Sequence, residues 1–168
     1  MKANRNIKAK ECLGDNFKQH LIQENDELIR NFENDKIKEA SGHNLSNIKS
    51  LNYENGSKFK GEFRNNKRHG KGIYYYTNGD IYAGDWKNDE FFGNGFYIFA
   101  SGERYRGEFK NGKKHGKGNY FYQNGCIYKG MWALDKKNGD GCYTYPNNGK
   151  RQFFSLNFRK VYRKLGKW

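Results

Sequence analysis

Between residues 59 and 127, aromatic residues and glycines recur at fixed positions with a period of 23 residues. Each unit begins with an aromatic residue, namely Phe59, Tyr82 or Tyr105, and a glycine follows two positions later. A second ring, a Gly-x-Gly pair, a third ring and a turn ending in glycine complete the unit. A period of this length indicates an array of similar supersecondary units stacked along one axis.

Within each unit the side chains alternate as expected for a strand. Residues 59, 61 and 63 are rings or glycine, whereas residues 60, 62 and 64 are charged. Successive side chains of a strand point to opposite faces of its sheet. We therefore predict one face of rings and glycines and an opposite face that is mostly charged or mixed. The glycines would leave room for neighbouring rings to lie over the backbone.

Turn-forming residues divide each unit into one hairpin. Asn78-Gly79 and Asn124-Gly125 predict tight turns in which both central residues have positive φ. Asn65-Asn66, Asn88-Asp89 and Asn111-Gly112 form turns at the opposite edge. The fold class predicted is mainly β, a single-layer antiparallel array of hairpins. We expect a half repeat at 51–58 and four repeats at 59–81, 82–104, 105–127 and 128–150.

The segments outside the array have a different pattern. Residues 1–14 form a polar leader, and residues 42–50 form a connector. Residues 15–41 between them form a helical segment with Phe17, Leu21, Leu28 and Phe32 on one apolar stripe. We expect this helix to lie on or cap the array, where a partner could displace it. Residues 151–168 are predicted as a capping or basic amphipathic helix, because apolar and basic residues separate onto two faces from Phe158 onward.

The repeated residues resemble a known family. The runs Phe59-Lys-Gly-Glu-Phe63, His69-Gly-Lys-Gly-Ile-Tyr74 and Asn78-Gly79 are similar to the MORN (membrane occupation and recognition nexus) repeat. The resemblance covers the predicted array and implies its fold. It also implies a role in cytoskeletal, ciliary or cortical membrane-skeleton assembly, because the family occurs in cytoskeletal scaffolds, membrane-contact proteins and appendages of lipid kinases and methyltransferases.

Composition and charge narrow the possible functions. A hydrophobic fraction of 35% with 30% charged residues is too polar for a thick core, whereas 17% aromatic residues argue against disorder. The net charge of +14 comes almost wholly from residues 51–168, so the array would face an anionic partner or remain soluble by repulsion. Three unpatterned cysteines and the absence of an apolar run that could span a bilayer favour a cytoplasmic location.

Candidate chemical groups do not assemble into a catalytic motif. His69 and His115 occupy the same position of two repeats and lie two units apart, too far to share a metal ion. The Gly-x-Gly pairs lie between strands rather than before a helix, unlike a dinucleotide-binding loop. We therefore expect no enzymatic activity, no cofactor and no metal.

The leading hypothesis is a scaffold that binds a helical or extended segment of a protein partner on its aromatic face. An apolar face on a single-layer sheet marks an interaction site. The candidate contact residues are Phe63, Tyr74, Trp86, Tyr97, Phe109, Tyr120, Trp132 and Tyr143.

The alternative hypothesis is peripheral binding to anionic, phosphoinositide-type membrane lipid. Basic residues in the repeat turns and in the C-terminal segment could supply the attraction. The candidate residues are Arg64, Lys67, Arg68, Lys113, Lys114, Arg159, Lys160, Arg163, Lys164 and Lys167. Nucleic acid binding ranks below both because no known module is present, and association into homodimers stays open.

Overall fold

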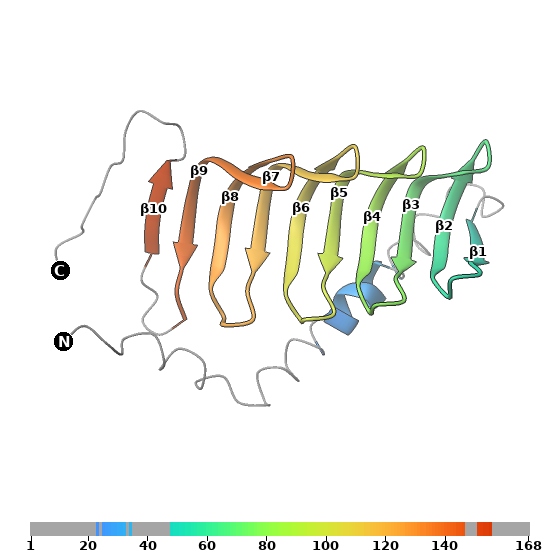
Figure 1. Ribbon diagram of the computed structural model, residues 1–168, viewed down its shortest axis with the longest axis horizontal. Helices are drawn as coiled ribbons and strands as arrows, with labels where there is room; N and C mark the ends of the chain where they lie inside the picture. Colours follow the sequence, from blue (N-terminus) through green and yellow to red (C-terminus); the bar gives the residue numbers. More distant parts are fainter. Residues whose placement is uncertain (1–22, 24, 33, 35–47, 147–150, 156–168) are drawn as a thin grey trace.

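The computed structural model describes residues 23, 25–32, 34, 48–146 and 151–155 (Figure 1). The predicted leader, most of the predicted helical segment, and the C-terminal segment from residue 156 lie outside the described residues. Residues 25–32 are helical, within the predicted helical segment.

Ten strands form one antiparallel sheet in which each strand pairs with the next along the chain (Figure 1). The strands are β1 (Ile48–Asn52), β2 (Lys58–Arg64), β3 (Lys67–Tyr75), β4 (Ile81–Lys87), β5 (Glu90–Ile98), β6 (Arg104–Lys110), β7 (Lys113–Phe121), β8 (Ile127–Ala133), β9 (Lys136–Thr144) and β10 (Arg151–Ser155). The prediction of a single-layer array of hairpins is thereby confirmed.

Two predicted boundaries are wrong. Strand β1 begins at Ile48, inside the predicted connector, and its residue Leu51 pairs with Phe59. Strand β10 occupies Arg151–Ser155, inside the segment predicted as a C-terminal helix, and Phe153 pairs there with Cys142. In both places the edge of the array supplies unpaired backbone groups, and the adjoining chain satisfies them by adding a strand.

The two edges of the ribbon use different turns, and the predicted assignment of positive φ was wrong. Near Asn78 only Gly79 has positive φ, at 88°, and Gly79 N–H donates to the Tyr76 carbonyl at 3.1 Å. This is a type I turn followed by a glycine bulge. At the opposite edge both central residues have positive φ, as in Asn88 (51°) and Asp89 (72°), which is the type I′ geometry.

A β-bulge interrupts the pairing inside every repeat, after Gly61, Gly84, Gly107 and Gly130. In three repeats a carboxylate accepts a backbone N–H that the bulge leaves unpaired. Glu62 accepts from Lys71 at 2.9 Å, and Glu108 accepts from Lys117 at 2.9 Å. The fourth repeat has Met131 at this position, which has no oxygen to accept such a bond.

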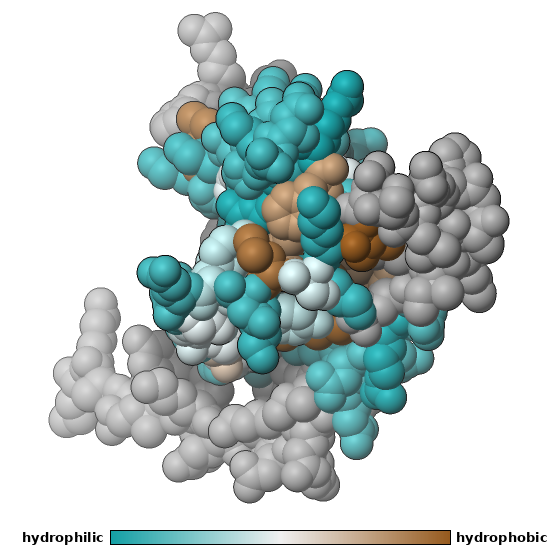
Figure 2. Space-filling model, turned by 90° about the vertical axis from the view of Figure 1, so that its right-hand side faces the viewer, coloured by the Kyte–Doolittle hydropathy of each residue, from teal (hydrophilic) through white to brown (hydrophobic). Residues whose placement is uncertain are grey.

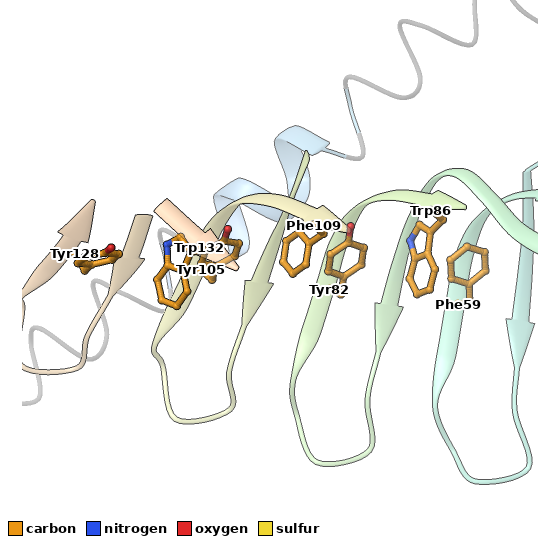
Figure 3. Packing of buried hydrophobic residues seen from close by; sticks show 7 residues of the cluster. All are labelled: Phe59, Tyr82, Trp86, Tyr105, Phe109, Tyr128 and Trp132. Atoms are coloured by element: carbon orange, nitrogen blue, oxygen red, sulfur yellow. The ribbon is translucent and has the colours of Figure 1, made fainter. Parts of the chain in front are cut away.

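Seven rings on one face of the sheet form its buried core (Figure 3). This ring core consists of Phe59, Tyr82, Trp86, Tyr105, Phe109, Tyr128 and Trp132, none more than 5% exposed. Edge-to-face contacts join successive repeats, because Phe59 meets Trp86 at 5.2 Å, Tyr82 meets Phe109 at 5.1 Å and Tyr105 meets Trp132 at 5.2 Å between ring centroids. The core therefore links each repeat only to its neighbours, as in other repeat arrays.

Paired glycines make this packing possible. Gly107 and Gly118 lie opposite each other on β6 and β7, and the Tyr105 ring lies over both. A Cβ atom at position 118 would stand 2.3 Å from the Tyr105 hydroxyl oxygen and 2.5 Å from Cε2. The indole nitrogen of Trp132 also donates to the Gly118 carbonyl at 3.1 Å. This hydrogen bond fixes the Trp132 ring to the backbone of β7.

The type I′ turns join neighbouring repeats. The Asp89 carboxylate accepts the backbone N–H of Arg68 at 2.9 Å, and the Asp89 N–H donates to the Arg68 carbonyl at 3.0 Å. Asp135 makes the same two bonds to Lys114, at 2.9 Å and 3.2 Å. The equivalent residue of the third repeat is Gly112, so only its backbone bond to the Phe91 carbonyl, at 3.1 Å, is formed.

We expect Gly118→Ala to destabilise the array by about 2 to 4 kcal/mol, because the added methyl group must displace the Tyr105 ring or the paired strand. Urea denaturation followed by circular dichroism measures the change. Gly125→Ala, at a turn position with φ of 76°, is the control for the loss of a glycine as such and costs about 1 kcal/mol. Equal losses at both positions would contradict the ring-over-glycine account.

We expect Gly112→Asp to stabilise the array by about 1 kcal/mol, because the new carboxylate can accept the Phe91 N–H as Asp89 accepts that of Arg68. Gly112 has φ of 72°, the same value as Asp89, so the backbone already suits the substitution. Gly112→Ala is the matched control, which has the same φ but no acceptor. If the aspartate variant unfolds at the same urea concentration as the alanine variant, the turn contact contributes nothing.

Candidate protein interaction surfaces

Nine partly buried or exposed rings run across the strands beside the ring core. This ring ladder consists of Tyr53, Tyr74, Tyr76, Tyr97, Phe99, Tyr120, Tyr122, Tyr143 and Tyr145. Each ring lies within 4.5 to 6.2 Å of the next, measured between centroids. It is a continuous aromatic strip, partly open to solvent, that crosses the hairpins from one repeat to the next.

The predicted contact residues divide between the two sets of rings. Tyr74, Tyr97, Tyr120 and Tyr143 belong to the ring ladder and stay candidate contacts. The prediction was wrong for Trp86, Phe109 and Trp132, because each is at least 95% buried in the ring core. Phe63 is partly buried and packs edge-to-face on Phe59 at 5.1 Å.

Sequence reasoning missed the second ring that each repeat adds to the ladder. Tyr76, Phe99 and Tyr122 recur at the repeat period, two positions after Tyr74, Tyr97 and Tyr120. A signal for them was present, since alternation placed Tyr76 on the same face as Tyr74. The turn assignment hid it, because these residues begin the loops rather than end the strands.

Carboxylates hold part of the ladder by its hydroxyl groups. Tyr97 donates to Asp80 at 2.8 Å, and Tyr120 donates to Glu103 at 2.7 Å. Burial, and then these hydrogen bonds, raise the pKa of both phenols above the ordinary value. Burial raises the pKa of Tyr76 to about 12. Tyr76, Tyr97 and Tyr120 are therefore uncharged at neutral pH, and the last two are held in place by their carboxylate partners.

Cations of the chain itself lie over the rings at one position of the repeat. Lys114 Nζ is 5.2 Å from the Tyr120 ring centroid and 5.3 Å from that of Trp132. Arg68 lies 4.5 Å from the Trp86 centroid, and Lys137 lies 4.8 Å from that of Tyr143. The second repeat places Phe91 here, stacked on Tyr82 at 3.8 Å. The position thus accepts either a cation or a ring over the ring core.

This arrangement corrects two of the predicted lipid-binding residues. Arg68 forms an ion pair with Asp89 at 3.0 Å, and its side chain is only 21% exposed. Lys114 is half-buried among rings, and burial lowers the pKa of its amine. Arg64, Lys67 and Lys113 are exposed at the type I′ turns. The remaining candidates, Arg159, Lys160, Arg163, Lys164 and Lys167, lie outside the described residues.

The face opposite the rings, called the helix face below, is more apolar at its centre than predicted. Ile73, Ala83 and Ile98 are at most 6% exposed, and Phe96 and Phe121 are partly buried beside them. Basic residues surround this centre, at positions Lys58, Lys60, Arg64, Lys67, Lys71, Lys87, Arg104, Arg106, Lys110, Lys113, Lys117, Lys129 and Lys136. Figure 2 looks along the ribbon from its β1 end, where hydrophobic residues lie near the middle of the described surface with hydrophilic residues above and below them.

The helical residues 25–32 lie against this face and not against the rings. Asn25, only 7% exposed, accepts a hydrogen bond from Arg104 of β6 at 3.2 Å. Leu28 and Phe32 face two hollows whose sheet walls include Phe96 and Arg106. The expectation that the helix lies on the array is met for these residues, but they leave the aromatic face uncovered.

Neither a cluster of metal-ligating side chains nor a membrane-spanning helix is found in the described part of the chain. His69 and His115 are partly buried, and no group of three His, Cys, Asp or Glu side chains there could hold a metal ion. None of the helical residues described forms a segment long and apolar enough to cross a bilayer.

The comparisons with known proteins agree with the repeat boundaries. The family described as MORN repeat matches residues 59–81, 82–104, 105–127 and 128–150. Among curated proteins, none matched the sequence. A solved structure, the SAS-4 (dCPAP) TCP domain of Drosophila melanogaster in complex with a proline-rich motif of Ana2 (dSTIL), is similar at 13% identity and a TM-score of 0.38. That match covers 65% of this chain and 53% of the other. The four consecutive matches span more than half of the sequence, and the chain belongs to the MORN repeat family.

Proposed function

We propose that this protein is a non-catalytic scaffold that binds a helical or extended segment of a protein partner along the ring ladder. The observation that carries the proposal is the continuity of the ladder across four repeats with its rings still partly open. Aromatic rings provide large contact areas at low entropic cost, and tyrosine is enriched at the centres of protein interfaces. The setting we propose is cytoskeletal, ciliary or cortical membrane-skeleton assembly in the cytoplasm.

The rigidity of the ladder favours binding over other roles. Tyr97 and Tyr120 are fixed by carboxylates, and Tyr122 and Tyr143 share a hydrogen bond between their hydroxyl groups at 2.9 Å. Side chains that are already ordered lose little entropy when a partner arrives. The ladder rings also pack against the ring core, as Tyr143 does against Tyr128 at 5.3 Å between centroids, which holds them further in place.

A second candidate function is attachment to anionic membrane, and the observation that favours it is the basic rim of the ribbon. Arg64, Lys67 and Lys113 are exposed at the type I′ turns and point away from the ring core. Each basic residue near an anionic surface contributes about 1 kcal/mol. Three such residues would support reversible binding only, so this function would accompany protein binding rather than replace it.

We expect a photoreactive phenylalanine analogue at Phe99 to cross-link the partner, whereas the same analogue at Phe92 captures much less. Phe99 lies within the ring ladder, and Phe92 is 39% exposed on the helix face. Both positions already hold phenylalanine, so the substitution changes each site to the same degree. Mass spectrometry of the cross-linked products from cells identifies the partner.

The cross-linking signal at Phe99 should fall at least about tenfold when Tyr76 and Tyr122 are changed to serine, because both rings belong to the ladder on either side of that site. Tyr75→Ser, one residue away on the helix face, is the matched control. Circular dichroism confirms that each variant is folded. Capture of that same partner that is equally strong at Phe92, or that survives loss of the two tyrosines, would rule out the ladder as its binding surface.

For the membrane function we expect the chain to float with vesicles of equal parts phosphatidylcholine and phosphatidylserine, but not with phosphatidylcholine alone. Changing Arg64, Lys67 and Lys113 together to glutamine should weaken binding by about 3 kcal/mol, which is more than a hundredfold. Changing Lys71, Lys117 and Lys129 to glutamine gives a control of equal charge away from the turns. Equal loss in both triple variants would show that net charge, and not the rim, determines binding.

A further inference from the structure

Residues 25–32 of the same chain occupy part of the helix face, and their side chains match two hollows on it. Residues 25–32 lie over two hollows of about 320 Å³ and 400 Å³ in which the sheet contributes Phe96 and Arg106 to both walls. Leu28 faces the first hollow and Phe32 the second. These two residues are four apart, so they lie on the same side of the helix, one turn from each other.

The polar groups around this contact are complementary in charge. Asp26, Glu27 and Arg30 of the helix are exposed, and of these three only Glu27 lines the same hollow as Arg104 and Arg106. Both arginines also lie over rings of the sheet, Arg104 at 4.5 Å from Phe121 and Arg106 at 5.1 Å from Phe96. A helix that carries acidic residues beside an apolar pair therefore meets a face of rings edged by guanidinium groups.

The contact between residues 25–32 and the helix face is shallow, so another helix could replace these residues. Leu28 and Phe32 are only partly buried, and both hollows beside them are open. An isolated helical segment is marginal in water, so the order of residues 25–32 depends on this contact. An intramolecular segment held by a few side chains can be exchanged for a longer helix of the same chemistry.

We propose that the helix face is a second docking surface, for an acidic amphipathic helix of a partner protein, and that residues 25–32 occupy it in the unbound chain. The partner helix would place a leucine and an aromatic residue one turn apart, with acidic residues beside them. This inference does not depend on the ring ladder, which lies on the other face of the same single-layer sheet. The chain could hold one partner on each face.

The centre of the helix face favours a protein helix over a polyanion. Ile73, Ala83 and Ile98 are buried there, and an apolar centre with a basic rim matches an amphipathic helix better than a phosphate backbone. Salt should accordingly weaken the association without abolishing it.

The test uses the 168-residue chain with Leu28→Asp and Phe32→Asp, two changes that should release residues 25–32 from the helix face; this variant is called the emptied chain. A fluorescent peptide of residues 15–41 is added in trans. We expect saturable binding to this variant, measured by fluorescence anisotropy. The peptide should bind the unmodified chain at least about tenfold more weakly, because the attached helix competes for the same surface. A peptide that carries the same two aspartates is the matched control and should not bind.

Changes in the receiving chain locate the site. Arg106→Glu, at an exposed position, should weaken binding about tenfold, and a peptide with Glu27→Arg should recover part of the loss. Tyr76→Ser, on the ring ladder, should leave affinity unchanged. The proposal is overturned if the peptide does not bind the emptied chain, if it binds the emptied and unmodified chains equally, or if Tyr76→Ser reduces affinity while Arg106→Glu does not.

Discussion

A ring lying flat over a pair of glycines is the contact on which the rest of this structure depends. A single-layer sheet has no second layer to bury its apolar side chains, so it must build a core on its own surface. Tyr105 covers Gly107 and Gly118, and the next ring, Trp132, meets its edge at 5.2 Å. Any side chain larger than hydrogen at those glycines would lift the ring and break the connection between repeats.

The same contact separates the structural rings from those available for binding. Once one aromatic residue per strand pair is committed to the glycines, the remaining tyrosines stand farther along the hairpin and form the ladder. The cations at positions 68, 114 and 137 then cover the exposed edge of the core, and Phe91 does so in the second repeat. Repeats that build their core in the same way thus differ in what surrounds it, and this is where specificity for a partner can vary.

The sequence predicts the period, the hairpins and the two faces, because these follow from spacing and alternation alone. It does not predict how deeply each ring is buried. Trp86 and Tyr97 lie on the same face, yet only the indole is buried, since burial depends on contact with Phe59 of the preceding repeat. The turns were misassigned for a related reason. A glycine after asparagine suits both a type I′ turn and a glycine bulge. Only the pairing register distinguishes the two, as in the hydrogen bond from the Tyr76 N–H to the Asp80 carbonyl.

The position of the helix could not be derived from pattern either, because an apolar stripe identifies which side of a helix is buried but not the surface that buries it. A face of rings appeared the better candidate. Those rings, however, already pack against one another, whereas Phe96 on the other face lines both hollows beside the helix. The short helix therefore lies where apolar surface remained uncovered. It also follows that the two faces differ in kind, one fixed by its own core and one completed by an exchangeable segment.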